Sequence, residues 1–337
     1  MPLLRLSYHF HENQHSSFLV KLNFRFDCYL CIPAFRRVIR IFCLNCRGLA
    51  GNFNCIEKMK KIAIQGIAGS FHEDAALRYF GEEIIDVVEC KSFKQVCELI
   101  DNDKVDIAVM AIENSIAGSL LQNYALIRDY HLRIIGEIYI HIQMNLMVFP
   151  GVKKKEIKEI YSHPVSFMQC AEYLEKYFPN AERRELGDNA KVAKLIHDEK
   201  ILHAAAISNS RSASLYGLEI LDKGIESNKK NYTRFLILAK HGIPAEGTNK
   251  ASLCFEVGHF YGSLARVLNI FAENKINLTK IQSVPIIGKP NEYTFHVDVE
   301  WEELFNYEHA IHIILRNVSS LSILGEYVRG ELAIHNQ

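Results

Sequence analysis

Three polar loops follow short apolar strands in the first two-thirds of the chain, and each precedes a helical pattern. They are residues 66–71 (Gly-Ile-Ala-Gly-Ser-Phe), 113–119 (Glu-Asn-Ser-Ile-Ala-Gly-Ser) and 162–166 (Ser-His-Pro-Val-Ser). In open parallel sheets, ligands bind beyond the carboxyl ends of the strands, and free N–H groups at a helix start favour an anion there. One such loop is more often a simple helix cap. Three together predict a cleft that binds a small anionic ligand.

A fourth candidate is the segment 231–235, Asn-Tyr-Thr-Arg-Phe, at the start of a predicted strand. Arg234 can bind a carboxylate through two parallel hydrogen bonds, and Thr233 places a hydroxyl beside it. The same pattern fits an edge strand with a surface arginine, so both interpretations stay open. In the third loop, His163 can serve as a general acid, although a histidine before Pro164 fits a turn equally well.

Residues 1–58 differ from the rest of the chain. They hold eight Lys/Arg against three Asp/Glu, a net charge of +5, and five of the nine cysteines. Two Cys-x-x-Cys pairs, starting at Cys28 and Cys43, have the spacing of a tetrahedral zinc site. A basic targeting segment is a second interpretation, and translation upstream of a working start at Met59 is a third. We favour the third, a non-native or disordered extension, because an orderly strand begins just after Met59.

The whole chain of 337 residues carries 39 basic and 39 acidic side chains, and 49% of it is hydrophobic. This composition excludes a disordered tail protein and gives no general electrostatic attraction to nucleic acid or to an anionic membrane. No apolar run approaches the ~18 residues that cross a bilayer, and the length suggests about two or three domains. The four cysteines after Met59 are scattered singly, which indicates free buried thiols in a reducing compartment, and we expect the cytoplasm.

From Met59 to Lys240, short apolar strands alternate with helical patterns. This alternation predicts parallel sheets with helices on both faces. A long β-rich stretch at 133–148 separates two such runs, which predicts two lobes with a cleft between them. The expected strands are 61–64, 84–88, 106–110, 159–161, 182–185, 204–207 and 232–238, and the expected helices are 74–80, 93–100, 119–129, 167–177 and 190–198, the last capped by Asp188.

Residues 241–250 have the composition of a linker, and the pattern changes at 251–331. Apolar residues alternate with polar ones in two predicted strands and recur at helical spacing in two predicted helices. The resulting order, strand–helix–strand–strand–helix–strand, predicts a separate ferredoxin-like α+β module.

The three polar loops at 66–71, 113–119 and 162–166 and the segment 231–235 occur in the order found in the prephenate dehydratases, which the chain resembles over about residues 60–330 and nowhere in 1–58. The segment after the linker resembles the ACT regulatory domain of that family, through Gly-Ser-Leu-Ala at 262–265 and the strand at 276–285. The catalytic motifs are, in order, Gly66-x-x-Gly69-Ser70-Phe71, Glu113-Asn114-Ser115-x-x-Gly118-Ser119, Tyr161-Ser162-His163-Pro164, Ala205-Ala-Ile-Ser208, Leu215-Tyr216-Gly217-Leu218 and Thr233-Arg234-Phe235.

The resemblance implies a two-lobed catalytic domain at 59–240, similar to a type II periplasmic binding protein, with the active site between the lobes. It implies conversion of prephenate to phenylpyruvate, CO2 and water in L-phenylalanine biosynthesis. No cofactor or metal is expected, because formation of the aromatic ring drives the reaction. Thr233 is the expected donor of a hydrogen bond to the departing hydroxyl, and a protonated Glu113 is a candidate proton donor. The other expected catalytic residues are Asn114 and Ser115, and the expected substrate-binding residues are Ser70, Phe71, Ser162, His163, Arg234 and Phe235.

The chain departs from the family pattern at three places. His72 stands where the family usually has Thr, Gln-Ser-Val-Pro at 282–285 stands for Glu-Ser-Arg-Pro, and the segment 262–265 stands for Gly-Ala-Leu-Val. The resemblance implies L-phenylalanine as an effector, because a helix start at Gly262 can hold its carboxylate beside a strand free to pair with a second copy. The expected effector-binding residues are Gly262, Ser263, Leu264, Ala265, Asn277, Leu278, Gln282 and Ser283.

Three other functions compete with this interpretation. Arogenate dehydratase acts on a substrate with an amino group in place of the side-chain keto group, and the sequence does not separate the two. A non-catalytic amino-acid sensor is a second alternative, against which the motifs at 113–115 and 233–235 argue. A solute-binding protein is a third, against which the lack of a secretory signal before Met59 argues. We expect a homodimer or homotetramer.

Overall fold

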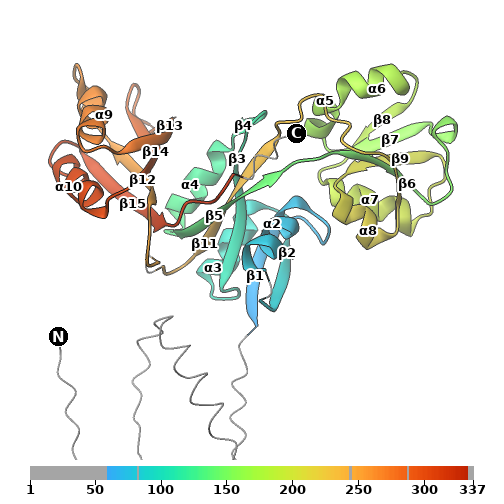
Figure 1. Ribbon diagram of the computed structural model, residues 1–337, viewed down its shortest axis with the longest axis horizontal. Helices are drawn as coiled ribbons and strands as arrows, with labels where there is room; N and C mark the ends of the chain where they lie inside the picture. Colours follow the sequence, from blue (N-terminus) through green and yellow to red (C-terminus); the bar gives the residue numbers. More distant parts are fainter. Residues whose placement is uncertain (1–58, 82, 243–244, 287, 333–337) are drawn as a thin grey trace, which may run out of the picture. The chain divides into compact units, whose positions relative to one another are not determined.

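The computed structural model describes residues 59–337 except 82, 243–244, 287 and 333–337. The predictions made for residues 1–58, including the zinc site and the non-native extension, lie outside the described residues. Three sheets organise the described part of the chain (Figure 1). None of the described helices is both long enough and apolar enough to cross a membrane.

The first lobe is built on a sheet with the strand order β2-β1-β3-β11-β5. Hydrophobic residues alternate along β1, so that Ile62 and Ile64 pack with α2 while Ala63 packs with α3 and α4 on the other face. The elements are β1 (Lys60–Gln65), α2 (Phe71–Phe80), β2 (Ile85–Cys90), α3 (Phe93–Asp101), β3 (Ile107–Asn114), β4 (Gly118–Ser119, paired with β3), α4 (Leu121–Asp129), β5 (Arg133–His141) and β11 (Tyr232–Ala239).

The second lobe has the strand order β10-β6-β9-β7-β8. Alternate residues of β9 contact different helices: Ala205 and Ile207 pack with α5 and α6, and Ala204 and Ala206 pack with α7 and α8. The elements are β6 (Asn145–Val148), a 3₁₀ turn (Lys154–Glu156), β7 (Glu159–Ser162), α5 (Pro164–Gln169), α6 (Ala171–Tyr177), β8 (Glu182–Glu185), α7 (Asn189–Asp198), β9 (Ala204–Ser208), α8 (Ser210–Tyr216) and β10 (Glu219–Asp222).

Neither sheet is parallel throughout, which corrects the prediction of parallel sheets. In the first lobe β11 runs antiparallel to both β3 and β5, and in the second lobe β6 runs antiparallel to β9 and β10. The chain leaves the first lobe through β5 and returns through β11. The two crossing segments pair with each other, since the Ile142 N–H donates to the Asn231 carbonyl at 2.7 Å and the Ile225 N–H donates to the Met144 carbonyl at 2.8 Å. The returning strand therefore enters its sheet in the opposite direction to β1 and β3.

The predicted helix boundaries hold at the capped ends. Ser92 accepts from the Gln95 N–H at the start of α3, and Asp188 accepts from the Ala190 N–H at the start of α7. The predicted helix 167–177 is two helices, α5 and α6, which meet at Cys170. The sequence prediction missed α8 and β10.

The C-terminal domain comprises β12 (Lys250–Glu256), α9 (Ser263–Glu273), β13 (Asn277–Pro285), β14 (Tyr293–Glu300), α10 (Leu304–Ile314) and β15 (Ser320–Tyr327). Along the chain these elements follow the predicted order strand–helix–strand–strand–helix–strand. The strands form one antiparallel sheet in the order β13-β14-β12-β15. Its own core gathers Phe255, Val267, Phe271 and Val297. A neighbouring core shares Leu324 and Tyr327 with residues of the first lobe, so the two domains pack directly on each other.

Candidate active site

A cavity of about 410 Å³ lies between the two lobes, within the size range of small-molecule sites, about 300–1,000 Å³. Its walls come from the ends of β1 and β3, from β11, and from the starts of α2, α5 and α7. Six of the residues expected at the site line it: Ser70, Phe71, Asn114, His163, Thr233 and Phe235. The other four expected residues, Glu113, Ser115, Ser162 and Arg234, are not part of the lining.

Thr233 and Asn114 form the polar centre of this cavity. Asn114 Nδ2 donates to Thr233 Oγ1 at 3.0 Å. The orientation of the Asn114 amide is fixed, because its Oδ1 accepts from the N–H groups of Ile116 at 3.0 Å and Ala117 at 2.8 Å. Since the Asn114 N–H group occupies a lone pair of the Thr233 hydroxyl, the hydroxyl hydrogen is left to donate to a ligand.

An amide chain extends this centre into the second lobe. Asn114 Nδ2 also donates to Asn231 Oδ1 at 2.7 Å, and Asn231 Nδ2 donates to Gln169 Oε1 at 3.1 Å. Asn231 is fully buried, whereas Gln169 lines the cavity from the end of α5. The orientation of Thr233 is therefore tied to both lobes. The sequence analysis quoted Asn231 only as the first residue of its motif and missed Gln169.

The start of α2 supplies a hydroxyl and an aromatic wall. Ser70 caps the helix by accepting from the Glu73 N–H at 3.3 Å, and Phe71 is half-buried beside it. His72 lines the cavity, and its ring meets the ring of Phe235 edge-on at a centroid distance of 5.0 Å. Burial lowers the pKa of His72 to about 4, so this histidine is neutral at pH 7 and contributes an apolar ring face.

The second lobe presents His163 and Asp188 to the cavity. His163 Nδ1 accepts from the Val165 N–H at 3.2 Å, so the neutral ring carries its proton on Nε2. Burial lowers the pKa of His163, so the ring is neutral at pH 7 and donates through Nε2 alone. Burial raises the pKa of Asp188, whose Oδ1 accepts from the Ala190 N–H at 2.8 Å. Of the described residues that line the cavity, Asp188 is the one acid, and none is a lysine or an arginine.

Ser162 lies behind the wall and positions a residue that lines it. The hydroxyl of Ser162 is fully buried and donates to Asn189 Oδ1 at 3.1 Å. Asn189 Nδ2 in turn donates to Ser166 Oγ at 2.8 Å, and both Asn189 and Ser166 face the cavity. The sequence analysis placed Ser162 in contact with the ligand, but the β-strand alternation of β7 turns it inward.

Hydrogen bonds between the lobes close the cavity at the loop that precedes α2. The Gly69 carbonyl accepts from Asn209 Nδ2 at 2.9 Å and from Ser212 Oγ at 2.8 Å, and the Ala68 carbonyl accepts from the Tyr216 hydroxyl at 2.6 Å. Gly69 has φ +86°, and a Cβ there would lie 3.1 Å from the Ser212 hydroxyl, so glycine is required for this approach. Helix α8, which the sequence analysis missed, and its cap residue Asn209 supply these contacts.

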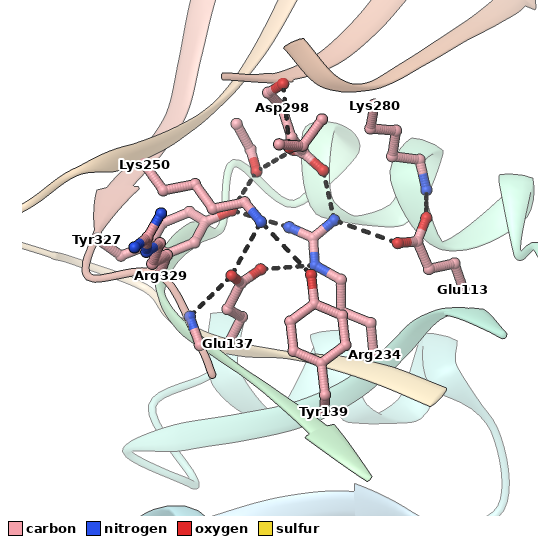
Figure 2. A network of polar contacts seen from close by, with 12 residues as sticks. Glu113, Glu137, Tyr139, Arg234, Lys250, Lys280, Asp298, Tyr327 and Arg329 are labelled. Atoms are coloured by element: carbon pink, nitrogen blue, oxygen red, sulfur yellow. Dashed lines mark hydrogen bonds and ion pairs between the residues drawn. The ribbon is translucent and has the colours of Figure 1, made fainter. Parts of the chain in front are cut away.

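Arg234 and Glu113 do not line the cavity. Their side chains point instead toward Asp298 and Lys280 of the C-terminal domain (Figure 2). Arg234 is 2% exposed, and its Nε donates to Glu137 at 2.6 Å. Glu113 pairs with Lys280 of the C-terminal domain and lies 3.6 Å from Arg234 Nη1. The structure thus corrects the expectation that Arg234 binds a ligand carboxylate, because successive residues of β11 point to opposite faces and Thr233 takes the cavity side.

Ser115 holds β3 to β11 instead of facing the cavity. Its hydroxyl donates to the Lys230 carbonyl and accepts from the Tyr232 N–H, both at 2.9 Å, and its N–H donates to the Tyr232 carbonyl at 2.8 Å. These contacts fix the backbone next to Asn114 and Thr233. Among the described residues, no cluster of three or more His, Cys, Asp or Glu side chains is placed to hold a metal ion.

A comparison with known protein families matches residues 62–243, more than half of the chain, to the family described as Prephenate dehydratase. The chain belongs to the prephenate dehydratase family. Among curated relatives, a protein of Arabidopsis thaliana named arogenate dehydratase/prephenate dehydratase 2, chloroplastic, is 33% identical over 280 residues, which is 79% of this chain and 72% of the relative.

Two solved structures share the fold of this chain. Prephenate dehydratase from Arthrobacter aurescens, solved in complex with L-Phe, has a TM-score of 0.73 and 26% identity over 80% of this chain and 90% of its own. A protein named GqqA and described as a quorum quenching acylase has a TM-score of 0.72 and 25% identity over 80% of this chain and 98% of its own. The prediction of two α/β lobes followed by an α+β domain is confirmed.

Another cavity, of about 560 Å³, lies in the C-terminal domain. Of the expected effector-binding residues, Ser263 and Leu264 line it, together with Phe260 and Tyr293. Gly262 is the cap residue just before α9 and has φ +76°, and Ala265 lies in the first turn of that helix. The remaining four lie on β13, an edge strand of its sheet: Asn277, Leu278, Gln282 and Ser283.

Proposed function

We propose that this protein converts prephenate to phenylpyruvate, CO2 and water, as a carbon–oxygen lyase of L-phenylalanine biosynthesis. The observation that carries the proposal is the Thr233 hydroxyl, which Asn114 orients in a cavity between two lobes of the family fold. In the reaction the bond from the ring to its carboxylate breaks, and its electron pair completes the aromatic ring. The ring C–O bond breaks, and the departing hydroxide takes up a proton from the solvent and leaves as water.

Thr233 donates its hydroxyl hydrogen to the departing oxygen in this proposal. A threonine is too weak an acid to give up its proton fully, so its contribution is a hydrogen bond that strengthens as negative charge develops. The aromatic rings of Phe71 and Phe235, with the neutral ring of His72, flank the ring of the substrate.

The two substrate carboxylates are bound by neutral donors. The cavity lining holds no cationic side chain among the described residues, whereas Ser70, His163 and Asn189 bring hydroxyl, N–H and amide groups to it. Backbone N–H groups at the start of α2 add positive partial charge. Glu113, Ser115, Ser162 and Arg234 act behind this wall and do not touch the substrate.

Arogenate dehydration is the second candidate function, and Asp188 favours it. Arogenate carries an ammonium group where prephenate has a keto group, and Asp188 is the one acid among the described lining residues. Burial raises the pKa of this carboxylate, and a substrate ammonium beside it would compensate its charge.

Incubation of the full chain with each substrate separately tests both functions. Phenylpyruvate formed from prephenate supports the proposal, and phenylalanine formed from arogenate supports the alternative. The Asp188→Asn variant is the internal comparison: if Asp188 binds the ammonium group, its loss lowers kcat/KM for arogenate by more than it does for prephenate. A folded chain that converts neither substrate contradicts both functions and favours an amino-acid sensor.

We further propose that L-phenylalanine regulates the chain through the C-terminal domain, and that this domain is an ACT domain. The α9 start beside a cavity of about 560 Å³ supports this, as does the relative solved with L-Phe. The exposed edge strand β13 is free to pair with a second copy, in line with the expected homodimer or homotetramer. The four described cysteines are free and buried, which suits the expected cytoplasmic location.

A further inference from the structure

Two neighbouring cross-strand pairs connect the active site to the C-terminal domain. In the register of β3 and β11, Asn114 lies opposite Thr233, and Glu113 lies opposite Arg234. The first pair faces the substrate cavity, and the second faces the C-terminal domain (Figure 2). Glu113 is bonded to Asn114 and Arg234 to Thr233, so the contacts of the second pair restrain the backbone that carries the first.

The Arg234 side chain is held by carboxylates from both domains. Its Nε donates to Glu137 of β5 at 2.6 Å, its Nη1 group donates to Asp298 of β14, and its Nη2 donates to the Tyr327 hydroxyl at 3.0 Å. Arg234 is 2% exposed, and the side chains of Glu137 and Asp298 are 0% and 5% exposed. Burial alone would raise the pKa of Asp298, but the charge of Arg234 and its hydrogen bond outweigh this and lower it.

The same cluster continues through buried groups of the C-terminal domain. Ser252 donates to Asp298 at 2.5 Å and lies 2.7 Å from the Tyr327 hydroxyl. Lys250 pairs with Glu137 at 3.0 Å and with Glu300 at 3.1 Å. Every carboxylate of the cluster therefore has a cationic or hydroxyl partner, so that the arrangement has little freedom to shift.

Lys280 makes the second connection, to Glu113. The ammonium group of Lys280 pairs with the Glu113 carboxylate, whose other oxygen lies 3.6 Å from Arg234 Nη1. Lys280 belongs to β13, the strand that carries four of the expected effector-binding residues. It also lies over the ring of Tyr124 in α4, at 4.9 Å from the centroid.

We propose that Glu113 and Arg234 are positioning residues, and that the C-terminal domain, through Lys280 and Asp298, fixes the placement of Asn114 and Thr233 in the active site. This inference rests on the proposed role of Thr233. A hydrogen bond to a departing oxygen depends steeply on geometry, and a misplacement of about 1 Å can cost about a hundredfold in rate. The C-terminal domain is in this view part of the catalytic apparatus even without an effector.

The Lys280→Met variant tests the proposal, with kcat and KM measured on the substrate that the wild-type chain converts. Glu113 keeps Arg234 as a partner in this variant, so we expect it to fold. We expect kcat to fall by about 2- to 30-fold while KM changes by less than about twofold, because the lost placement matters most in the transition state. Lys280→Arg, which keeps the charge, restores most of the loss.

Two comparisons separate positioning from a general loss of structure. Lys289→Met removes an exposed ion pair with Glu292 in the same domain and leaves kcat unchanged. Glu113→Gln combined with Lys280→Met lowers kcat no further than the worse of the two single variants, because Lys280 acts through Glu113. Thermal melting of each variant gives the folded fraction by which kcat is normalised.

The results that would contradict the positioning role differ from those that would contradict the proposed function. An unchanged kcat in Lys280→Met, losses that multiply in the double variant, or a loss that disappears after normalisation overturns the positioning role. If the wild-type chain itself converts neither prephenate nor arogenate, the proposed function fails, and the inference fails with it. An active wild type with an unaffected Lys280→Met contradicts the positioning role alone.

Discussion

Thr233 differs from a surface threonine in that its hydrogen-bond roles are assigned by its neighbours. Asn114 donates to it, and two backbone N–H groups prevent the Asn114 amide from reversing. The hydroxyl hydrogen is then free to donate into the cavity. In the proposed reaction, negative charge leaves the ring carboxylate as CO2 forms and develops on the departing oxygen, where a hydrogen bond from Thr233 strengthens.

His72 makes folding stability depend on pH. Its pKa is about 4 in the folded chain against 6.5 in the unfolded chain, so the unfolded chain binds more protons between these values. The contribution of neutral His72 to the free energy of unfolding is therefore complete above pH 6.5 and is lost as the pH drops toward 4. Between pH 7 and pH 5, we expect the free energy of unfolding of the wild type to fall by about 2 kcal/mol more than that of His72→Gln, as measured by urea unfolding. Equal losses in both proteins would show that His72 is not buried in its neutral form.

At the scale of single elements, β11 shows what a motif does and does not specify. The Thr-Arg-Phe motif located the strand, and the period of two along a strand would have separated Thr233 and Phe235 from Arg234. Which face meets the substrate depends on the partner strands β3 and β5, which the sequence pattern does not order. The same reasoning applies to Glu113 and Asn114 on β3.

The elements with a local signal were predicted well. Capping residues and apolar periodicity located α3, α7 and all strands of the C-terminal domain. The misses have physical reasons: α8 is seven residues long with only Ser212 and Ala213 buried, and the direction of β11 follows from its return through the second lobe. Asn189 and Gln169 were missed as site residues because the contacts that bring them to the cavity join distant segments.

The packing of β15 on β5 gives a prediction at this scale. A Cβ at Gly325 would lie 2.0 Å from the backbone carbonyl oxygen of Ile134, so the two strands approach too closely for any other residue. Gly325→Ala should lower the free energy of unfolding by about 1–3 kcal/mol, since backbone must shift. Ser322→Ala, at an exposed position of the same strand, is the matched control and should change it by less than about 0.5 kcal/mol. Equal stability of the two variants in urea would contradict this packing.

At the scale of the whole molecule, the C-terminal domain has two roles in this account, holding the active site and sensing the end product. Lys280 contacts Glu113 from β13, and the proposed effector-binding residues lie on that strand and at the start of α9. A ligand that shifts β13 would change the placement of Asn114. Regulation and positioning would thus use the same contacts.

Titration of the full chain with L-phenylalanine tests the sensing role. We expect calorimetric heat of binding and a lower rate of substrate conversion, with neither effect from L-aspartate, whose charged side chain does not suit the aromatic wall formed by Phe260 and Tyr293. A chain that is active but shows no heat with L-phenylalanine would remove the regulatory proposal and leave the catalytic one intact.

The most direct test of the account is the turnover of Thr233→Ala and Thr233→Ser beside the wild type, on whichever of the two substrates the wild type converts. If the Thr233 hydroxyl stabilises the departing oxygen, Thr233→Ala lowers kcat by about 10²–10³-fold. Thr233→Ser keeps the donor and retains most of the activity. Equal kcat in all three proteins, each shown to be folded, would contradict the assignment of Thr233 as the hydrogen-bond donor of the reaction.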